Sequence, residues 1–131
     1  MSWNRVIDKW TKKVPSDISK VQRKISLDLS SNVIVRTPVD TGAARGEWLG
    51  SFDTPASSPS GMTDKTGAAT LAKISNVVSG FDGKSDQVFY LTNNAPHIVK
   101  LEYESHSPQA ANGMVRVSVE LIKRKYKRLF K

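Results

Sequence analysis

The segment RTPVDTGAARGEW, residues 36–48, constrains the fold of this chain more than any other. Pro38 cannot continue a helix, because its ring removes a backbone N–H and disfavours the helical conformation at the residue before it. The following Asp-Thr-Gly supplies two side chains that bond to nearby backbone and a glycine that accepts a positive φ. An apolar run, WLGSF, begins at Trp48. We therefore expect a corner between a helix and a strand, in which Asp40 caps the following turn and contacts Arg45.

Apolar residues recur at helical spacing before this corner, from Trp3 to Val33. Pro15 interrupts the pattern, so we expect a short amphipathic helix over residues 3–14. Ser16 is a good N-cap residue, and it predicts a second helix that ends near Arg36.

Residues 53–68, which follow the apolar run, are rich in Pro, Ser, Gly, Thr and Asp. This composition buries too little apolar area to offset the entropy lost on ordering, and a loop of this length is unusual in a small domain. Hydrophobic residues make up 38% of the whole chain, which is below the usual globular share. We expect residues 53–68 to form a flexible loop or an arm that reaches a neighbouring subunit.

The rest of the chain adds further elements to a single domain, residues 1–131, which is long enough to bury a core. Residues 67–79 are predicted to form a helix, residues 88–92 a strand, and residues 96–103 a short helix. Asn112 is a good N-cap for a long C-terminal helix, although the alternating valines at its start also suit a strand. The prediction is an α+β fold: a small sheet flanked by helices, with long N-terminal and C-terminal helices and one long flexible loop.

The net charge of +8 is concentrated at the two ends of the chain. Residues 1–37 hold eight Lys and Arg against three Asp, which gives +5, and residues 38–111 hold five against eight acidic residues, which gives −3. Residues 112–131 hold seven against one Glu, which gives +6, so the three blocks sum to +8. Such a distribution suits nucleic acid, an anionic surface or an acidic protein.

The C-terminal segment is the most basic part of the chain, with six Lys or Arg among residues 123–131. Three interpretations stay open: a solvated helix end favoured by the helix dipole, contact with an acidic protein surface, and contact with phosphates. Contact with DNA here would be independent of sequence and strongly weakened by salt. The candidate contact residues are Lys123, Arg124, Lys125, Lys127 and Arg128.

Residues that carry catalysis or bind metals are sparse. The chain has no cysteine, and its two histidines, His97 and His106, have only single carboxylates nearby in the sequence, which is not the spacing of a metal site. No spacing brings two acidic residues together as an acid–base pair. We therefore expect no enzyme activity, no cofactor and no metal. Without a signal peptide or an apolar run that could span a bilayer, we expect a soluble protein made in a cytoplasm.

Three segments of the chain resemble bacteriophage neck and tail-completion proteins. Residues 36–48 resemble the family signature TPVDTG…R…W, and residues 91–103, LTNNAPHIVKLEY, resemble its N…PYA…LEYG segment. Residues 107–116, SPQAANGMVR, resemble its S.QAP.GMVR segment. The three segments follow the family's order and span most of the chain. An aromatic residue, glycine and proline are common in the family where this sequence has His97, Glu104 and Ala111.

The resemblance implies a structural virion protein at the neck or tail end of a long-tailed phage, made in the host cytoplasm, which completes the tail so that head and tail join. It implies a small α+β subunit in a ring around the DNA channel, with a hexamer favoured and a dodecamer as the alternative. Its neighbours would be connector or stopper proteins and tail-terminator or tail-tube proteins, with non-specific contact to DNA in the channel. The residues expected to fix the corner are Pro38, Asp40, Thr41, Gly42, Arg45 and Trp48.

Two other functions stay open. A tail-terminator ring, which caps the tail tube, shares the size and symmetry that the resemblance implies. A basic module that binds nucleic acid without sequence preference would also account for the charge of +8. Against the second function, the basic segments lack interleaved stacking aromatics outside Tyr126 and Phe130, and no nucleic-acid-reading motif is recognisable.

Overall fold

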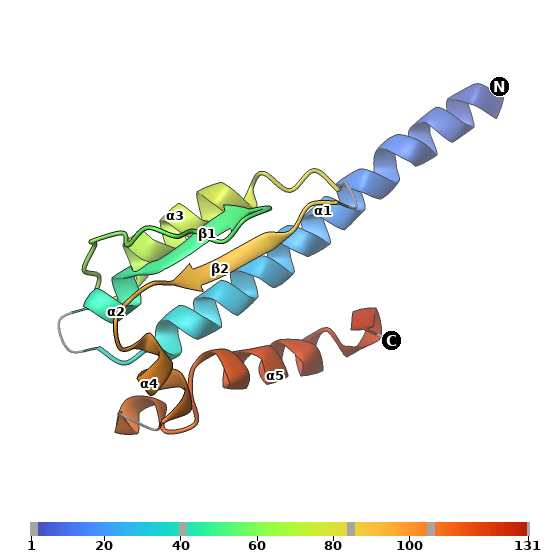
Figure 1. Cartoon of the computed structure of the whole chain (residues 1–131). Helices are drawn as coiled ribbons and strands as arrows, with labels where there is room; N and C mark the ends of the chain where they lie inside the picture. The colour runs from blue at the N-terminus through green and yellow to red at the C-terminus, as the bar shows by residue number, and fades with distance from the viewer. Residues whose placement is uncertain (1–2, 40–41, 84–85, 105–106, 131) are drawn as a thin grey trace.

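The computed structural model describes residues 3–39, 42–83, 86–104 and 107–130 of the chain (Figure 1). The chain has the predicted α+β fold, in which helices accompany a two-stranded antiparallel sheet. The elements, in chain order, are α1 (Trp3–Arg36), α2 (Ala43–Gly46), β1 (Trp48–Phe52), α3 (Ala68–Val78), β2 (Phe89–Asn93), α4 (Ile98–Tyr103), the 3-10 helix η1 (Pro108–Ala110), α5 (Val115–Lys125) and the 3-10 helix η2 (Lys127–Phe130).

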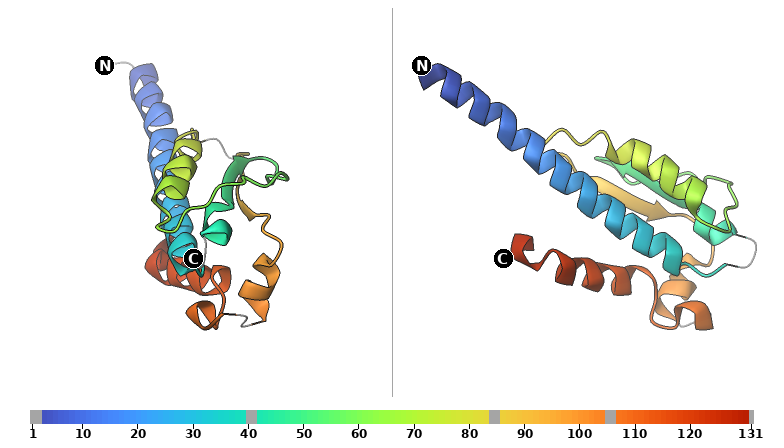
Figure 2. Two further views of the ribbon diagram at one scale, coloured as in Figure 1. Left: turned by 90° about the vertical axis from the view of Figure 1, so that its left-hand side faces the viewer. Right: turned by 180° about the vertical axis from the view of Figure 1, so that it is seen from behind.

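Helix α1 is one continuous element of 34 residues, so the predicted break at Pro15 is wrong. An interior proline removes one backbone hydrogen bond and costs about 3 kcal/mol, but helix propagation on both sides of it is cooperative, so a long helix can continue past it. The C-terminal half of α1 packs against α3 and α5, whereas its N-terminal part projects beyond the other elements (Figures 1 and 2). The helix ends at Arg36, as Pro38 predicts. None of the described helices is both long enough and apolar enough to cross a membrane.

The sheet joins two segments that lie about forty residues apart in the sequence. Trp48 lies opposite Asn93 at one end of the pairing, and Phe52 lies opposite Phe89 at the other. The side chains alternate between the two faces of the sheet, and the residues that pack into the core include Trp48, Phe52, Phe89 and Leu91. The prediction of a strand at residues 88–92 is confirmed to within one residue at each end.

The core lies between this face of the sheet and the two helices α1 and α3, which lie side by side (Figure 2). Its fully buried side chains include Val33 and Ile34 from α1 and Ile74 and Val78 from α3. Phe81 follows α3 and contacts Phe52 edge to face, with ring centroids 4.8 Å apart. The helix predicted at residues 67–79 is therefore confirmed, and it supplies one side of the core.

Helix α5 returns along α1 and begins at Val115, so the prediction that Asn112 caps it is wrong. The first N–H groups of α5 bind the carboxylate of Glu102 from α4 instead of a side chain close in sequence. Residues 115–119 are helical, which excludes the alternative of a strand there. The expected long C-terminal helix is an 11-residue helix followed by η2.

Candidate functional site

The corner, residues 36–48, is organised around the guanidinium of Arg45. This side chain donates to the carbonyl oxygen of Thr37 from Nε at 3.3 Å and from Nη2 at 2.8 Å, and Nη2 also donates to Val35 O at 3.0 Å. Nη1 donates to Lys65 O at 2.6 Å in the long loop. The last carbonyls of a helix have no intrahelical donor. Arg45 supplies donors to these groups and ties the loop to the end of α1.

Thr37 and Trp48 form a buried contact beneath Arg45. The hydroxyl of Thr37 donates to Val33 O at 2.7 Å and accepts a hydrogen bond from Trp48 Nε1 at 2.8 Å. Thr37 is fully buried and Trp48 is 5% exposed. Buried indole N–H groups normally need a partner, and the helix end provides one here. The contact anchors the first residue of β1 to the last turn of α1.

Gly42 allows the long loop to cross the corner in close contact. Its φ is +89°, and a Cβ there would lie 2.8 Å from the backbone of Asp64 and Lys65. Gly42 O accepts from Asp64 N at 2.9 Å and from Gly46 N at 2.9 Å. A side chain at Gly42 would therefore meet both a strained conformation and a steric clash.

The carboxylate of Asp64 caps the N-terminus of α3 from the end of the long loop. It accepts from Gly67 N at 3.0 Å and from both N and Oγ1 of Thr70 at 2.8 Å. The backbone bond from Thr70 and its companions lower the pKa of Asp64 despite partial desolvation. A carboxylate at a helix N-terminus is stabilising because it accepts hydrogen bonds from the free N–H groups and is favoured by the helix dipole.

Glu47 holds the middle of the long loop. The residue is 8% exposed, and its carboxylate accepts from Ser60 N and Gly61 N, each at 2.8 Å. Ser60 Oγ donates to Gly46 O at 2.8 Å. The loop therefore bonds to its own corner at several points along residues 60–65. Contact of residues 53–68 with a neighbouring subunit stays a prediction.

The three segments that carry the family resemblance are hydrogen-bonded to one another. Asn93 Nδ2 donates to Ala44 O at 2.8 Å, which joins the end of β2 to the corner. The Gln109 side chain accepts from Val39 N at 3.0 Å and donates to Val39 O at 3.4 Å, which joins η1 to the corner. The third connection runs from α4 to α5 through Glu102. We call this arrangement of residues 36–48, 91–103 and 107–116 the junction.

Glu102 makes the most extensive polar contacts of the junction. Its carboxylate accepts from the N–H groups of Met114 at 2.6 Å, Val115 at 3.0 Å and Arg116 at 2.9 Å, and from Arg116 Nε at 3.3 Å. Burial, the largest single influence, raises the pKa of Glu102, but the bonds from Arg116, Met114 and Val115 outweigh it, so the pKa is lowered. The carboxylate thus stays ionised and satisfies the first donors of α5.

Gly113 allows Glu102 to reach this position. Its φ is +86°, and a Cβ there would lie 2.7 Å from Glu102 O and 2.9 Å from the carboxylate carbon. The turn before α5 therefore needs a residue without a side chain, and Gly113 lies within the third resembling segment.

The predicted corner residues fall into two groups. The structure places Arg45 and Trp48 at the end of α1 and Gly42 against the loop that Arg45 binds, with Pro38 two residues after the helix. Asp40 and Thr41 lie outside the described residues, so the predicted contact between Asp40 and Arg45 stays a prediction.

Sequence reasoning missed four residues of the junction: Glu47, Asn93, Glu102 and Gln109. Each one bonds to backbone at least 12 positions away in the sequence. Spacing rules detect neighbours within a few residues, so the only signal was that all four residues lie within the resembling segments.

In the basic C-terminal segment, one of the candidate contact residues bonds to α1. Lys125 Nζ donates to Asp28 Oδ2 at 2.8 Å, and the Tyr126 hydroxyl donates to the same oxygen. The hydrogen bond from Lys125, followed by that from Tyr126, lowers the pKa of Asp28, and the bond to Asp28 raises the pKa of Lys125. The remaining candidate contact residues are exposed: Lys123, Arg124, Lys127 and Arg128.

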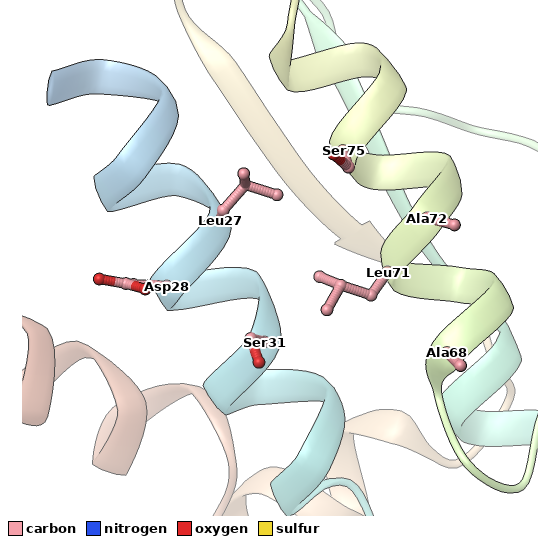
Figure 3. Close-up of a pocket in the computed structure, with 7 residues that line it drawn as sticks. All are labelled: Leu27, Asp28, Ser31, Ala68, Leu71, Ala72 and Ser75. Carbon is pink, nitrogen blue, oxygen red and sulfur yellow. The ribbon is translucent and has the colours of Figure 1, made fainter. Parts of the chain in front are cut away.

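A shallow groove lies between α1 and α3 on their outer side (Figure 3). Leu27 and Leu71 point toward one another across it, whereas Asp28 points away, toward α5 (Figure 3). The other lining residues are small: Ser31, Ala68, Ala72 and Ser75. Asp28 is the one charged residue among those that line it, and its carboxylate bonds to Lys125 and Tyr126. The groove offers an apolar surface and no pair of groups suited to acid–base chemistry.

Among the described residues there is no group of three His, Asp or Glu side chains that could hold a metal ion. His97 occupies the N-cap position of α4 and makes no side-chain cap there, and His106 lies outside the described residues. Glu47 and Glu102 are committed to backbone N–H groups. The described polar groups therefore organise the backbone.

Comparison of the chain with protein-family models, with curated proteins and with solved structures gave no match.

Proposed function

We propose that this chain is a structural subunit of the neck or tail end of a long-tailed bacteriophage. In this proposal it completes the tail and lets head and tail join, as part of a ring that surrounds the DNA channel. The ring is hexameric, with a dodecamer as the alternative, and it lies between connector or stopper proteins on one side and tail-terminator or tail-tube proteins on the other. The protein acts through its surfaces and has no reactive centre.

The observation that carries the proposal is the junction. The first of the three segments that resemble the family lies far in the sequence from the other two, yet it bonds to both through side chains: Asn93 to Ala44 and Gln109 to Val39. The second and third segments are joined through Glu102 and Met114. A chance resemblance would have no reason to fall on residues that meet in space. A shared set of long-range contacts is what a common fold would require.

Two further features fit a subunit of an assembly. The N-terminal part of α1 projects away from the other elements (Figure 1). Two apolar side chains of this helix are exposed, Ile18 at 43% and Val21 at 40%. The end of α5 presents exposed cations, which suit an acidic face of an adjoining ring or channel DNA. Apolar and charged surfaces of this kind are covered when a subunit assembles.

The location of the protein in virions tests the proposal. Purified particles of a phage that encodes this chain are expected to contain it at a ring-like copy number, measured by quantitative mass spectrometry against the tail-tube protein, and antibody labels are expected at the neck. Its absence from purified particles would refute the role. A label at the top of the tail in particles that lack heads would instead favour the tail-terminator ring.

The exposed cations favour one second function, a module that binds nucleic acid without sequence preference. Arg124 is exposed near the end of α5, and Lys127 and Arg128 are exposed in η2. Filter binding to duplex DNA at rising salt separates the two functions. A chain whose main role is assembly is expected to lose all binding near physiological salt, because only weak backbone attraction would act. Tight binding at that salt, abolished by alanine at the three positions, would establish the second function.

A further inference from the structure

In the part of the chain that the structure describes, neither edge of the two-stranded sheet pairs with a further strand. Asp53 N donates to Val88 O at 2.8 Å, in line with the register of the strands. Since directly opposed pairs in an antiparallel sheet alternate between bonded and non-bonded, the backbone groups of Leu49 and Ser51 face β2. Those of Trp48 and Gly50 therefore face outward from β1.

The same alternation applies to β2. The N–H and C=O groups of Phe89 and Leu91 face outward from it, because the residues between them bond to β1. Among the described residues, no group outside the sheet supplies a hydrogen-bond partner to the backbone N–H or C=O of Trp48, Gly50, Phe89 or Leu91. Two strands are marginal as an isolated sheet, and three or more are the usual minimum for independent stability.

These edges also lack the features that normally protect an edge strand. Proteins block exposed edges with lysine or other charges, with proline, or with a covering element. The sequences of β1 and β2, WLGSF and FYLTN, contain neither a charged residue nor a proline, although 24% of the chain is charged. Unprotected edges of this kind pair with another strand.

We propose that β1 of one copy of this chain adds to the free edge of β2 of the next copy, so that the sheet continues from subunit to subunit. The inference rests on the proposed ring, for which it names the interface. Both strands are five residues long and present their free groups at alternate positions, so each edge matches the other in length and spacing.

The geometry of such a contact is heterologous, since it joins two different edges. A heterologous contact that closes produces a ring, and a closed ring of sheets leaves no free edge. Successive copies in a ring keep the same strand directions, and β1 and β2 are antiparallel within one copy. The added pairing is therefore antiparallel as well.

Amide hydrogen exchange tests the interface directly, on the full chain, in monomer and oligomer fractions separated by size. In the monomer, the amides of Gly50, Phe89 and Leu91 are expected to exchange freely, whereas the amides that bond across the sheet are protected; Trp48 is left out because it is 5% exposed. In the oligomer the exchange of these three amides is expected to slow by at least about tenfold, the change that ~1.4 kcal/mol of protection gives. A charged variant supplies the second measurement.

Thr92 lies on β2 between two residues with outward-facing backbone groups and bonds to β1, so its side chain lies on the sheet face opposite the core. Thr92→Lys is expected to weaken self-association about fivefold or more, because a charged side chain on an edge strand opposes the addition of another strand. Thr92→Val, which keeps the strand shape, and Asn76→Lys, which adds the same charge on an exposed part of α3, are expected to leave it unchanged. Circular dichroism checks that all three variants fold.

The outcomes separate this inference from the proposed function. A ring in which the amides of Gly50, Phe89 and Leu91 still exchange freely would overturn the strand interface and leave the ring role intact. If the chain fails to self-associate and the amides are protected only by another tail protein, a second copy of this chain is not what pairs with the strand edges. Protected amides in an oligomer that is absent from virions would support the interface and refute the role in the neck.

Discussion

Single side chains in this protein satisfy backbone groups that the helices leave without partners. Helix α1 ends before Pro38, and Arg45 donates to the carbonyls of Val35 and Thr37 at this end. Glu102 performs the complementary role at the start of α5, where it accepts from three successive N–H groups. Both side chains therefore connect distant segments while they complete a helix end.

Arg45→Ala is expected to lower the free energy of unfolding by about 2 kcal/mol, because several charge-assisted hydrogen bonds to backbone carbonyls are lost. The loop at Lys65 loses its tie to the corner in the same step. Urea denaturation followed by tryptophan fluorescence measures the change. Arg124→Ala, which removes an exposed arginine, is the matched control and should stay within about 0.5 kcal/mol of the parent. Equal midpoints for the two variants would mean that Arg45 does not stabilise the corner.

Glu102→Gln is expected to destabilise the fold at neutral pH and to do so less as the solution is acidified. The folded-state pKa of Glu102 is lowered from the ordinary value of 4.5. A lowered pKa contributes stability that is complete above 4.5 and is lost as the pH falls from there through the folded-state pKa. The difference in unfolding free energy between parent and variant, measured in urea at a series of pH values, should therefore shrink below that point. A difference that does not depend on pH would contradict the ionised cap.

Gly113→Ala is expected to destabilise the fold more than Gly61→Ala. Both glycines have positive φ, +86° and +68°, so alanine is strained at either position by about 1 kcal/mol. At Gly113 the added Cβ would also lie 2.7 Å from Glu102 O, whereas at Gly61 nothing lies within 4 Å. Thermal unfolding of the two variants isolates the steric contribution. Equal losses of thermal stability in the two variants would show that Glu102 moves away from the added Cβ without a cost in stability.

The sequence predicts the local features of the corner well and its long-range contacts poorly. Pro38 predicts the end of α1, and the positive φ at Gly42 follows from turn chemistry. The partners of Glu47 and Glu102 are backbone N–H groups, which every residue except proline carries. No sequence pattern distinguishes one such group from another, so these contacts appear only once the fold has formed.

At the scale of elements, hydrophobic periodicity predicts α3 and β2, and it fails where tertiary packing decides. The periodicity of α1 continues on both sides of Pro15, and the structure keeps one helix where the proline alone predicts two. The start of α5 is set by Glu102 from α4, so the good local cap at Asn112 is not used. In both cases a local rule gives way to cooperativity or to a distant partner.

Helix α5 is fastened to α1 at its C-terminal end through Asp28, which accepts from Lys125 and Tyr126. Asp28→Asn is expected to loosen this end of α5 and to speed tryptic cleavage after the basic residues 123–128 several-fold, with little change in the thermal midpoint. Asp17→Asn, which removes an exposed carboxylate elsewhere on α1, is the matched control. The same cleavage rate in both variants would mean that packing alone holds α5 in place.

At the scale of the whole molecule, a small core is combined with surfaces that a lone subunit leaves uncovered. The projecting part of α1, the open edges of the sheet and the basic end of α5 lie outside the core between α1, α3 and the sheet. The junction holds the other end of the molecule together. Such a division suits a subunit whose surroundings in an assembly complete it.

The role proposed for the protein is tested most directly by electron microscopy of particles made in its absence. A phage that encodes this chain, with the reading frame deleted, is expected to produce filled heads and separate tails that do not join, and the parental gene supplied in trans should restore joined particles. Intact, infectious particles assembled without the protein would contradict the account.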